Sequence, residues 1–430
     1  MDTPHPSPLQ RRGALAALSL CMLLPSLATS SASVALPSLA SAFHASFNSV
    51  QWVLLAYLLA TTALVVSAGR AGDALGRKRT LLAGMALFTA ASAACGLAPT
   101  LPALIAARAV QGAGAAIVTA LAMAFVADAM PKSRVGGGMG VLGAMTAAGT
   151  ALGPSLGGFF IATVGWRWIF LANVPAGLAA LWLAYMHLPR GMPQAAKPHA
   201  GPAPGRPVLL RDATVASGLA MNAIVSTLVM STLVVGPFYL SLALQLDAAR
   251  VGLVMSIGPA VVALTGMPAG RLADRFGAPR TMVVGLACTT AACFALFALP
   301  VASNLAGYIS AIVVLTLGYS LFTTANNTAV MSGVDPARRG AASGMLGLSR
   351  NAGLIAGASI MGVLFAAACG SDDLASAAPG AVAHGMRVTF GIGATLGMVA
   401  IAIALGRLRA PRPPAPSCRP SSRAVPASPR

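Results

Sequence analysis

The sequence contains no glutamate, and only 9% of its 430 residues carry a charge. The nine acidic residues are therefore all aspartates, and aromatic residues make up only 5% of the chain. A water-soluble fold needs far more charge on its surface, so this composition excludes an ordinary soluble domain. Hydrophobic residues account for 57% of the chain, which indicates an integral membrane protein.

Several catalytic and cofactor motifs are also missing. The chain has no Gly-x-x-x-x-Gly-Lys-[Ser/Thr] motif, which argues against an ATP-binding phosphate loop in this sequence. Its six cysteines show no metal-ligand spacing, and its five histidines are scattered without a neighbouring carboxylate. We therefore expect no metal, no cofactor and no enzymatic activity.

Long apolar stretches dominate what remains. A spanning helix needs ~20 mostly apolar residues, and twelve such stretches run from residues 13–36 to residues 388–405. The alternating pattern of β-barrel spans is absent. We predict an all-α polytopic membrane protein with twelve transmembrane helices in two pseudo-symmetric six-helix bundles. The expected divisions are an N-terminal tail (1–10), a first bundle (11–187), a Pro-rich linker (188–211), a second bundle (212–408) and a basic tail (409–430).

The basic residues are distributed unevenly along the chain. Most of the 28 Lys and Arg residues fall in segments that the order of the spans places on one side of the membrane. By the positive-inside rule, that side is the cytoplasm, and both termini lie there. The net charge of +19 is therefore explained by topology and by attraction to the lipid bilayer, and we expect no nucleic-acid partner.

The two halves of the chain repeat each other. The charged turn at residues 69–79 returns, with its glycines and aspartate in register, at residues 270–280, roughly 200 positions later. A second glycine pattern repeats at one constant offset: Gly140, Gly143, Gly149, Gly153 and Gly158 correspond to Gly344, Gly347, Gly353, Gly357 and Gly362. Two independent patterns at nearly the same offset indicate internal duplication.

Small residues in the fifth span predict close helix packing. Glycines spaced by three and four positions lie on one helix face and let a neighbouring backbone approach, while a proline within the span bends the helix. The predicted packing residues are Gly140, Gly149, Gly153, Pro154, Gly157 and Gly158.

These motifs resemble those of the major facilitator superfamily. The turn at residues 69–79 is similar to that family's signature loop, and Arg108 with Gln111-Gly112-x-Gly114 is similar to its fourth-span motif. The fifth-span glycines, together with Gln51-Trp52 and residues 166–175, resemble the drug:proton antiporter branch. The resemblance implies secondary active transport of small amphiphilic compounds outward across a bacterial inner membrane, driven by protons, by a protein that we expect to be monomeric.

Two departures separate the chain from the fourteen-span antiporters. Only twelve spans are present, and Ala28 stands where those relatives commonly carry an aspartate in the first span. No aspartate of the chain falls in the middle of a span. The usual buried proton-carrying carboxylate is therefore absent. An importer, a uniporter and a non-transporting sensor with the same fold remain as alternatives.

The repeated charged turn is a candidate conformational latch. Asp73 is suited to bond the positive N-terminal end of a helix in the opposite half, and Arg77 to pair with Asp128. The resemblance implies that the partner helix is the eleventh span and that the latch favours an outward-open state. The alternative is that these charges only mark topology. The latch residues are Gly69, Asp73, Gly76, Arg77, Asp128, Gly270, Asp274 and Gly277.

Two arginines lie within spans, where each costs ~3 kcal/mol or more to insert. Arg108, with Gln111, is a candidate for coupling or substrate binding, and the alternative is that Arg108 snorkels to the outer interface. Arg350 either faces a central cavity or bonds backbone carbonyls in helix packing. If both arginines face the cavity, neutral or anionic amphiphiles are preferred over lipophilic cations.

Polar side chains in several spans are candidates for the wall of a central cavity. Hydroxyl and amide groups among apolar residues suit loosely specified hydrophobic ligands. The alternative is that they pack helices together or bond their own preceding carbonyls. The candidates are Thr29, Ser30, Ser33, Tyr57, Asn222, Ser226, Tyr239, Tyr319, Asn326 and Asn327.

Overall fold

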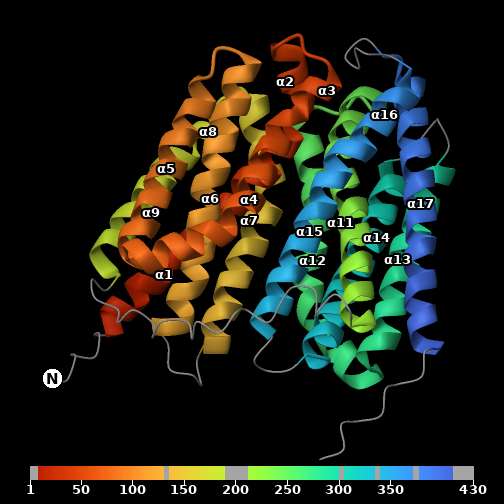
Figure 1. Ribbon diagram of the computed structural model, residues 1–430. Helices are drawn as coiled ribbons and strands as arrows, with labels where there is room; N and C mark the ends of the chain where they lie inside the picture. Colours follow the sequence, from red (N-terminus) through yellow and green to blue (C-terminus); the bar gives the residue numbers. More distant parts are fainter. Residues whose placement is uncertain are drawn as a thin grey trace, which may run out of the picture.

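The computed structural model describes residues 8–129, 135–188, 212–299, 305–334, 339–370 and 377–409. Within these ranges every regular element is a helix, and the helices run side by side in two bundles (Figure 1). Helices satisfy their backbone hydrogen bonds internally, which a chain in lipid must do because no water is available as a partner. The predicted all-α architecture is confirmed.

The first bundle contains six helical passes, of which three are interrupted. They are α1 (Pro8–Val34) continued by α2 (Leu36–Ala42), α3 (Phe47–Val50) with α4 (Trp52–Leu75), α5 (Arg77–Leu97), α6 (Leu101–Ala129), α7 (Val135–Thr163), and α8 (Trp168–Leu171) with α9 (Asn173–His187). The first helix thus begins ahead of the expected boundary at residue 11.

The second bundle repeats this order of passes. They are α11 (Ala213–Phe238) continued by the π-helical segment η1 (Tyr239–Ala243), α12 (Ala248–Phe276), α13 (Ala278–Ala298), α14 (Leu305–Ser332), α15 (Arg339–Ala356) continued by the π-helical segment η3 (Gly357–Met361) and α16 (Gly362–Cys369), and α17 (Pro379–Arg409). The expected linker beyond residue 188 and the expected tail beyond residue 409 lie outside the described residues.

Eleven of these passes are long and apolar enough to span a membrane, counted over the described part of the chain. The pass that is not among them is α7, whose glycines, threonines, serine and proline lower its mean hydropathy. Because α7 is nevertheless a 29-residue helix within the bundle, the structure contains the twelve predicted passes.

Both charged turns owe their shape to one glycine each. Gly76 joins α4 to α5 with φ +93°, and Gly277 joins α12 to α13 with φ +85°. Side chains with a Cβ rarely adopt this backbone conformation. A threonine hydroxyl in the first turn of the following helix then bonds back to the glycine. Thr80 donates to the carbonyl of Gly76 at 3.0 Å, and Thr281 donates to that of Gly277 at 3.1 Å. The repeat in sequence is therefore a repeat in backbone geometry.

The duplicated glycines pack each bundle in the same way. A Cβ on Gly149 of α7 would overlap the carbonyl oxygen of Leu23 on α1, and one on its duplicate Gly353 would overlap that of Ala223 on α11. Gly153 likewise faces α1 at Ser30, and its duplicate Gly357 faces α11 at Thr227. Close backbone approach through glycine replaces the hydrophobic effect, which is absent between helices in lipid.

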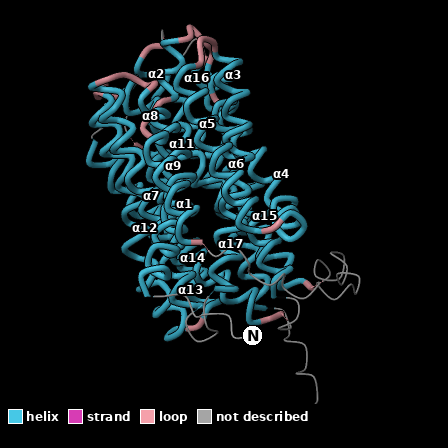
Figure 2. The backbone as a smooth tube through the Cα atoms, turned by 90° about the vertical axis from the view of Figure 1, so that its left-hand side faces the viewer, coloured by secondary structure: helices cyan, strands magenta, loops and turns pink. Residues whose placement is uncertain are grey.

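The two bundles meet at one end. Figures 1 and 2 both place α2, α3 and α16 at the end opposite the N-terminus, which we call the outer end; the end with the N-terminus is the inner end. The largest contact between bundles joins the outer half of α7 to α12. A Cβ on Gly158 would lie only 2.9 Å from the Cα of Gly252, and the hydroxyls of Ser155 and Ser256 are hydrogen-bonded at 2.5 Å.

A second contact at the outer end joins α3 to the other bundle. The ring of Phe47 lies edge-on to Phe238 of α11 at 4.9 Å and to Phe365 of α16 at 5.4 Å between centroids. Gly362, the duplicate of Gly158, faces Gln51, whose Oε1 would lie 2.5 Å from an added Cβ. The outer end is therefore closed on both sides by the two copies of one glycine position.

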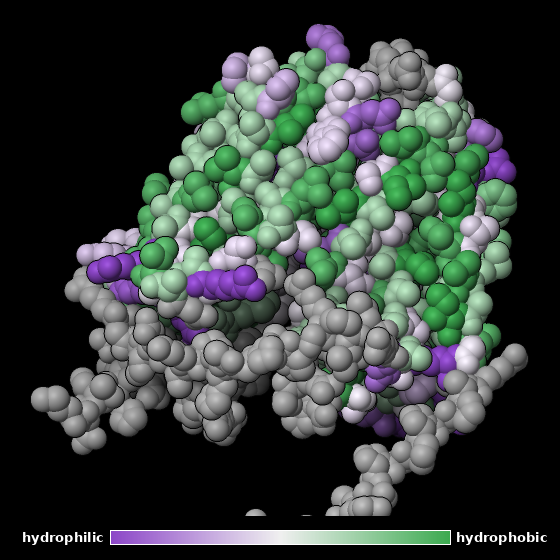
Figure 3. Space-filling view, viewed as in Figure 1, coloured by the Kyte–Doolittle hydropathy of each residue, from purple (hydrophilic) through white to green (hydrophobic). Residues whose placement is uncertain are grey.

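Glycines of the inner halves are uncovered instead. An added Cβ on Gly140 or Gly143 of α7, or on Gly344 or Gly347 of α15, would meet nothing within 4 Å. All four residues are exposed, and the space-filling view shows the surface hollowed between the bundles toward the inner end (Figure 3). The face seen in Figure 3 is mainly hydrophobic over the coloured part of both bundles, as contact with lipid requires. The two bundles are thus in contact at the outer end and apart at the inner end. We call the space between them at the inner end the inner recess.

We predict that Gly158→Val separates the outer ends of the bundles. Overpacking against a backbone costs ~1–3 kcal/mol, and ~1.4 kcal/mol changes a population about tenfold. Spin labels at Val164 and Gln245, in a variant without the native cysteines, should report longer outer distances. Gly406→Val on α17 is the matched control, because an added Cβ on Gly406 would meet nothing within 4 Å. Equal behaviour of the two variants would contradict a closing role for the glycine contact.

Candidate functional site

Arg108 lies at the centre of the first bundle with no exposed surface. Its Nε donates to the carbonyl of Val53 on α4 at 2.9 Å, and its Nη1 donates to Oε1 of Gln111 at 2.6 Å. The amide of Gln111 donates in turn to Ser92 of α5 at 2.7 Å, and Ser92 donates to the carbonyl of Phe88. A chain of hydrogen bonds therefore joins three helices through one arginine.

Aromatic rings replace a counter-ion around this arginine. The guanidinium carbon lies 4.2 Å from the ring centre of Tyr57 and 5.9 Å from that of Phe170 on α8. Cations are attracted to the faces of such rings, and more so when water is excluded. The hydroxyl of Tyr57 donates to the carbonyl of Pro25 at 3.1 Å, which connects α1 to the group. Snorkelling of Arg108 is therefore wrong, because the guanidinium is enclosed.

One nitrogen of the group is unused. Nη2 of Arg108 is buried and has no hydrogen-bond partner among the described residues. An unpaired buried donor is costly and therefore uncommon. The role of Arg108 and Gln111 in coupling or substrate binding stays a prediction, since both side chains are sealed from the inner recess in this conformation.

Arg350 has the opposite surroundings. Its side chain is exposed on the inner half of α15, and within the described ranges it makes no hydrogen bond or ion pair. Its neighbour Ser349 does pack the helix, donating to the carbonyl of Leu219 on α11 at 2.5 Å. The packing alternative for Arg350 finds no contact in support of it.

Most cavity candidates are buried between helices of one bundle in this conformation. Ser30 donates to the carbonyl of Gly149 at 3.2 Å, Asn222 to that of Leu346 at 3.0 Å, and Asn326 to that of Gly218 at 3.2 Å. The remaining candidates are Thr29 and Ser33, which bond preceding carbonyls of α1; buried Tyr57, Ser226 and Tyr239; half-buried Tyr319; and exposed Asn327. Their place on a cavity wall stays a prediction.

The latch residues are described only in part. The side chains of Asp73 and Asp128 lie outside the described residues, so the pairs predicted for them stay predictions. Gly69, Gly270 and Arg77 are half-buried, and Asp274 is exposed. The backbone of the turn has the geometry set by Gly76 and Gly277.

Two features of the inner rim and the seam were not anticipated from the sequence. Lys78 donates from Nζ to the carbonyl of Tyr185 at 2.8 Å and also to that of Leu188, so that it caps the end of α9. Cations are favoured at helix C-termini, but nothing in the sequence indicates which helix is meant. Gly252 and Ser256, the α12 partners of α7, likewise stand in no motif.

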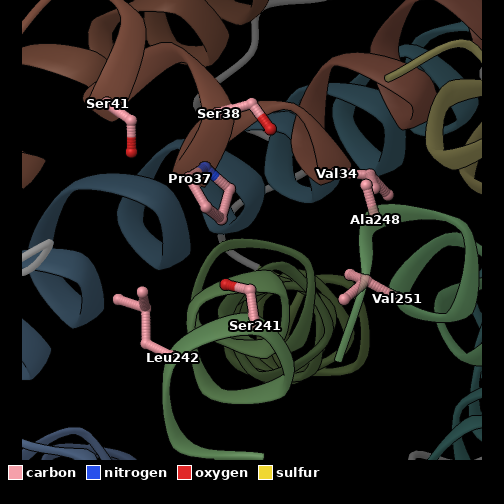
Figure 4. Close-up of a pocket in the computed structure, with 8 residues that line it drawn as sticks. All are labelled: Val34, Pro37, Ser38, Ser41, Ser241, Leu242, Ala248 and Val251. Atoms are coloured by element: carbon pink, nitrogen blue, oxygen red, sulfur yellow. The ribbon is translucent and has the colours of Figure 1, made fainter. Parts of the chain in front are cut away.

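A small cavity remains at the outer end. Its volume is about 220 Å³, and it lies between α1–α2, η1 and α12 (Figure 4). Hydroxyls of Ser38, Ser41 and Ser241 share the wall with aliphatic residues. Drug-sized ligands occupy ~300 to 1,000 Å³, so this cavity is space left between the closed bundles and too small for such a ligand.

We predict that Arg108→Ala destabilises the protein by about 1–3 kcal/mol, because Gln111 and the carbonyl of Val53 lose a charged donor in a buried setting. Unfolding of the detergent-solubilised protein, followed by tryptophan fluorescence, measures the change. Arg350→Ala is the control and should stay within about 0.5 kcal/mol of the parent protein, since its side chain is exposed and unpaired. Equal losses in the two variants would argue against the enclosed role of Arg108.

Comparison with known proteins gives a family and a range of functions. Residues 18–358 match the family described as the Major Facilitator Superfamily. The chain is 27% identical over 382 residues to the riboflavin transporter RibZ of Clostridioides difficile, which covers 77% of this chain and 83% of that protein. It is 38% identical over 156 residues to the multidrug resistance protein Stp of Mycobacterium tuberculosis, covering 36% of this chain but only 29% of Stp.

Solved structures agree on the fold. A bacterial homolog of the human lysosomal transporter Spinster, in an inward-facing and occupied conformation, superposes with a TM-score of 0.77 at 19% identity, covering 95% of this chain and 98% of that one. A D-xylose-proton symporter superposes with a TM-score of 0.74 at 15% identity, covering 91% and 96%. With the family match extending over most of the sequence, the chain belongs to the major facilitator superfamily and is a secondary transporter in the membrane, not an enzyme.

Proposed function

We propose that this transporter exports small amphiphilic molecules by alternating access. The observation that carries the proposal is the unequal use of the duplicated glycines. Those of the outer halves pack closely against the opposite bundle or against their own, whereas Gly140, Gly143, Gly344 and Gly347 face open space. Two bundles that rock about a central site need surfaces of this kind at both ends, one set engaged in each state.

The geometry of α7 and α12 supports such rocking. The helices are antiparallel at their contact, since Ser155 and Gly158 of α7 meet Ser256 and Gly252 of α12 in reverse order. Continuing this pairing inward brings Gly140 opposite Gly270 when the inner end closes. Small residues at both ends of one helix pair therefore suit two alternative contacts.

Direction and substrate class rest on motif resemblance. The glycine and proline pattern of α7 resembles that of exporters, and one relative is a multidrug resistance protein, while another transports riboflavin. We place the protein in a bacterial inner membrane as a monomer, with both termini in the cytoplasm, because the basic residues concentrate at the inner end.

Proton coupling requires a side chain within the spans that can carry a proton. No acidic side chain lies in the middle of a membrane-spanning segment, where a proton carrier is usually found. The absence favours uniport of the substrate as the second candidate. Proton antiport and uniport share the same alternating-access cycle, and they differ only in how the transport rate responds to a pH gradient.

Transport in proteoliposomes distinguishes these functions. We predict that a neutral fluorescent amphiphile crosses vesicles containing the protein faster than protein-free vesicles, and that Gly158→Val lowers this rate about tenfold. A rate that responds to an imposed pH gradient indicates antiport, and an unresponsive rate indicates uniport. Transport by Gly158→Val at the full rate would contradict alternating access through the α7–α12 seam.

The latch gives a second prediction. Asp73→Asn removes the charge that favours a bond with a helix N-terminus, so the inner end should open further in the population. Spin labels at the exposed residues Val141 and Leu348 measure this distance across the inner recess. Asp274→Asn, the duplicate in the second bundle, is the control for a general effect of charge. An unchanged distance distribution in Asp73→Asn would leave Asp73 as a topology marker.

A further inference from the structure

Arg350 stands deep within the membrane-spanning part of α15. The span that contains it runs from Ala341 to Cys369, and α15 begins at Arg339. The pass from Arg339 to Cys369 has its midpoint near residue 354, so at 1.5 Å per residue Arg350 lies roughly 6 Å to the inner side of that midpoint, within a ~30 Å hydrocarbon core. The ordinary outcome for an exposed surface arginine, a head in bulk water beside the membrane, is unavailable at this depth.

Packing of the fold does not require an arginine there. The duplicated glycine pattern aligns Arg350 with Thr146 of α7, in the same register that matches Gly143 to Gly347 and Gly149 to Gly353. Thr146 is half-buried and only bonds the carbonyl of Leu142 in its own helix, at 3.0 Å. Because the duplicated helix α7 packs in its bundle with a threonine at this position, helix packing does not explain the charge of Arg350.

The face of α15 that carries Arg350 is directed away from lipid. Positions three and seven residues before it on the same face are Gly347 and Ser343, both exposed and small, with nothing within 4 Å of an added Cβ on Gly347. Leu348, which is 53% exposed, lies two residues from Arg350 on the other side of the helix, and an apolar side chain of this kind suits contact with lipid. We therefore assign the side that carries Arg350 to the inner recess between the bundles.

Among the described residues, no acidic group pairs with this charge. The aspartates of the described spans lie at helix ends, as Asp212 and Asp247 do where they cap α11 and α12. The other arginine within a span, Arg108, is enclosed by carbonyls and rings of its own bundle and cannot reach the recess. In the described part of the recess, the guanidinium of Arg350 therefore has no partner, and the small residues Ser343 and Gly347 lie beside it on the same helix face.

We propose that Arg350 binds the anionic group of the transported amphiphile, a carboxylate or sulfonate, while the apolar body of the same molecule lies in the recess between the bundles. A guanidinium presents paired donors that match the two oxygens of such a group. This assignment rests on the proposed function and narrows it to organic anions. It also divides the roles of the two arginines: Arg108 holds the first bundle together, and Arg350 contacts substrate.

Three dyes that share one fluorophore test the assignment. The full-length protein in nanodiscs is titrated with dansyl sulfonate, neutral dansylamide, and a dansyl derivative with a quaternary ammonium group. We expect the sulfonate to bind more tightly than the amide and the cation to bind least. In Arg350→Thr, which copies the duplicated position, the ratio of sulfonate to amide affinity should fall about tenfold, as the loss of a charge-assisted hydrogen bond predicts.

Two further variants make the result specific. Arg350→Lys keeps the charge without the paired donors, so it should recover part of the ratio, and Arg250→Thr removes an exposed arginine of an outer ion pair and should keep the full ratio. An unchanged ratio in Arg350→Thr, with dansylamide bound and transported, overturns the role of Arg350 and leaves amphiphile transport standing. If the parent protein neither binds nor transports any of the three dyes, both proposals fail.

Discussion

Closure of the outer end depends on two backbones that touch. Gly158 and Gly252 bring α7 and α12 so close that a single methyl group would overlap main-chain atoms. Neither helix has a hydrophobic reason to associate with the other, because lipid solvates apolar side chains as well as a neighbouring helix does. Dispersion contacts along a smooth surface, with one hydroxyl pair added, are what remain. Such a contact is strong only at short range, so it either forms completely or is lost, as a transporter with two states needs.

The internal duplication places a glycine at the same position of both bundles, but the two glycines have different partners at the outer end. At Gly158 the partner is backbone, whereas at its duplicate Gly362 the partners are the side chains of Gln51 and Phe47. Side chains can adjust where backbone cannot. The two sides of the outer closure therefore differ in stiffness, with a rigid seam on one side and an aromatic cluster of Phe47, Phe238 and Phe365 on the other.

Sequence patterns predicted the helices, their number and the internal repeat, because apolar length and glycine spacing are local properties. They predicted that α7 packs closely, yet they did not reveal that Gly149 and Gly153 serve its own bundle while Gly158 serves the opposite one. That division depends on where three helices meet in space. The same limit applied to Arg108: an arginine in a span is visible from sequence, but its carbonyl and ring partners come from α4 and α8. Polar residues taken for a cavity wall proved hardest to assign, since hydroxyls in a helix bond their own backbone equally well.

The capping of α9 by Lys78 bears on how the two halves communicate. Its ammonium group is anchored to the last carbonyls before the chain leaves the first bundle. Lys78 lies in the first turn of α5, directly after the glycine turn of the signature loop. The end of α9 is therefore tied to that loop, and a displacement of the loop moves the last turn of the first bundle with it.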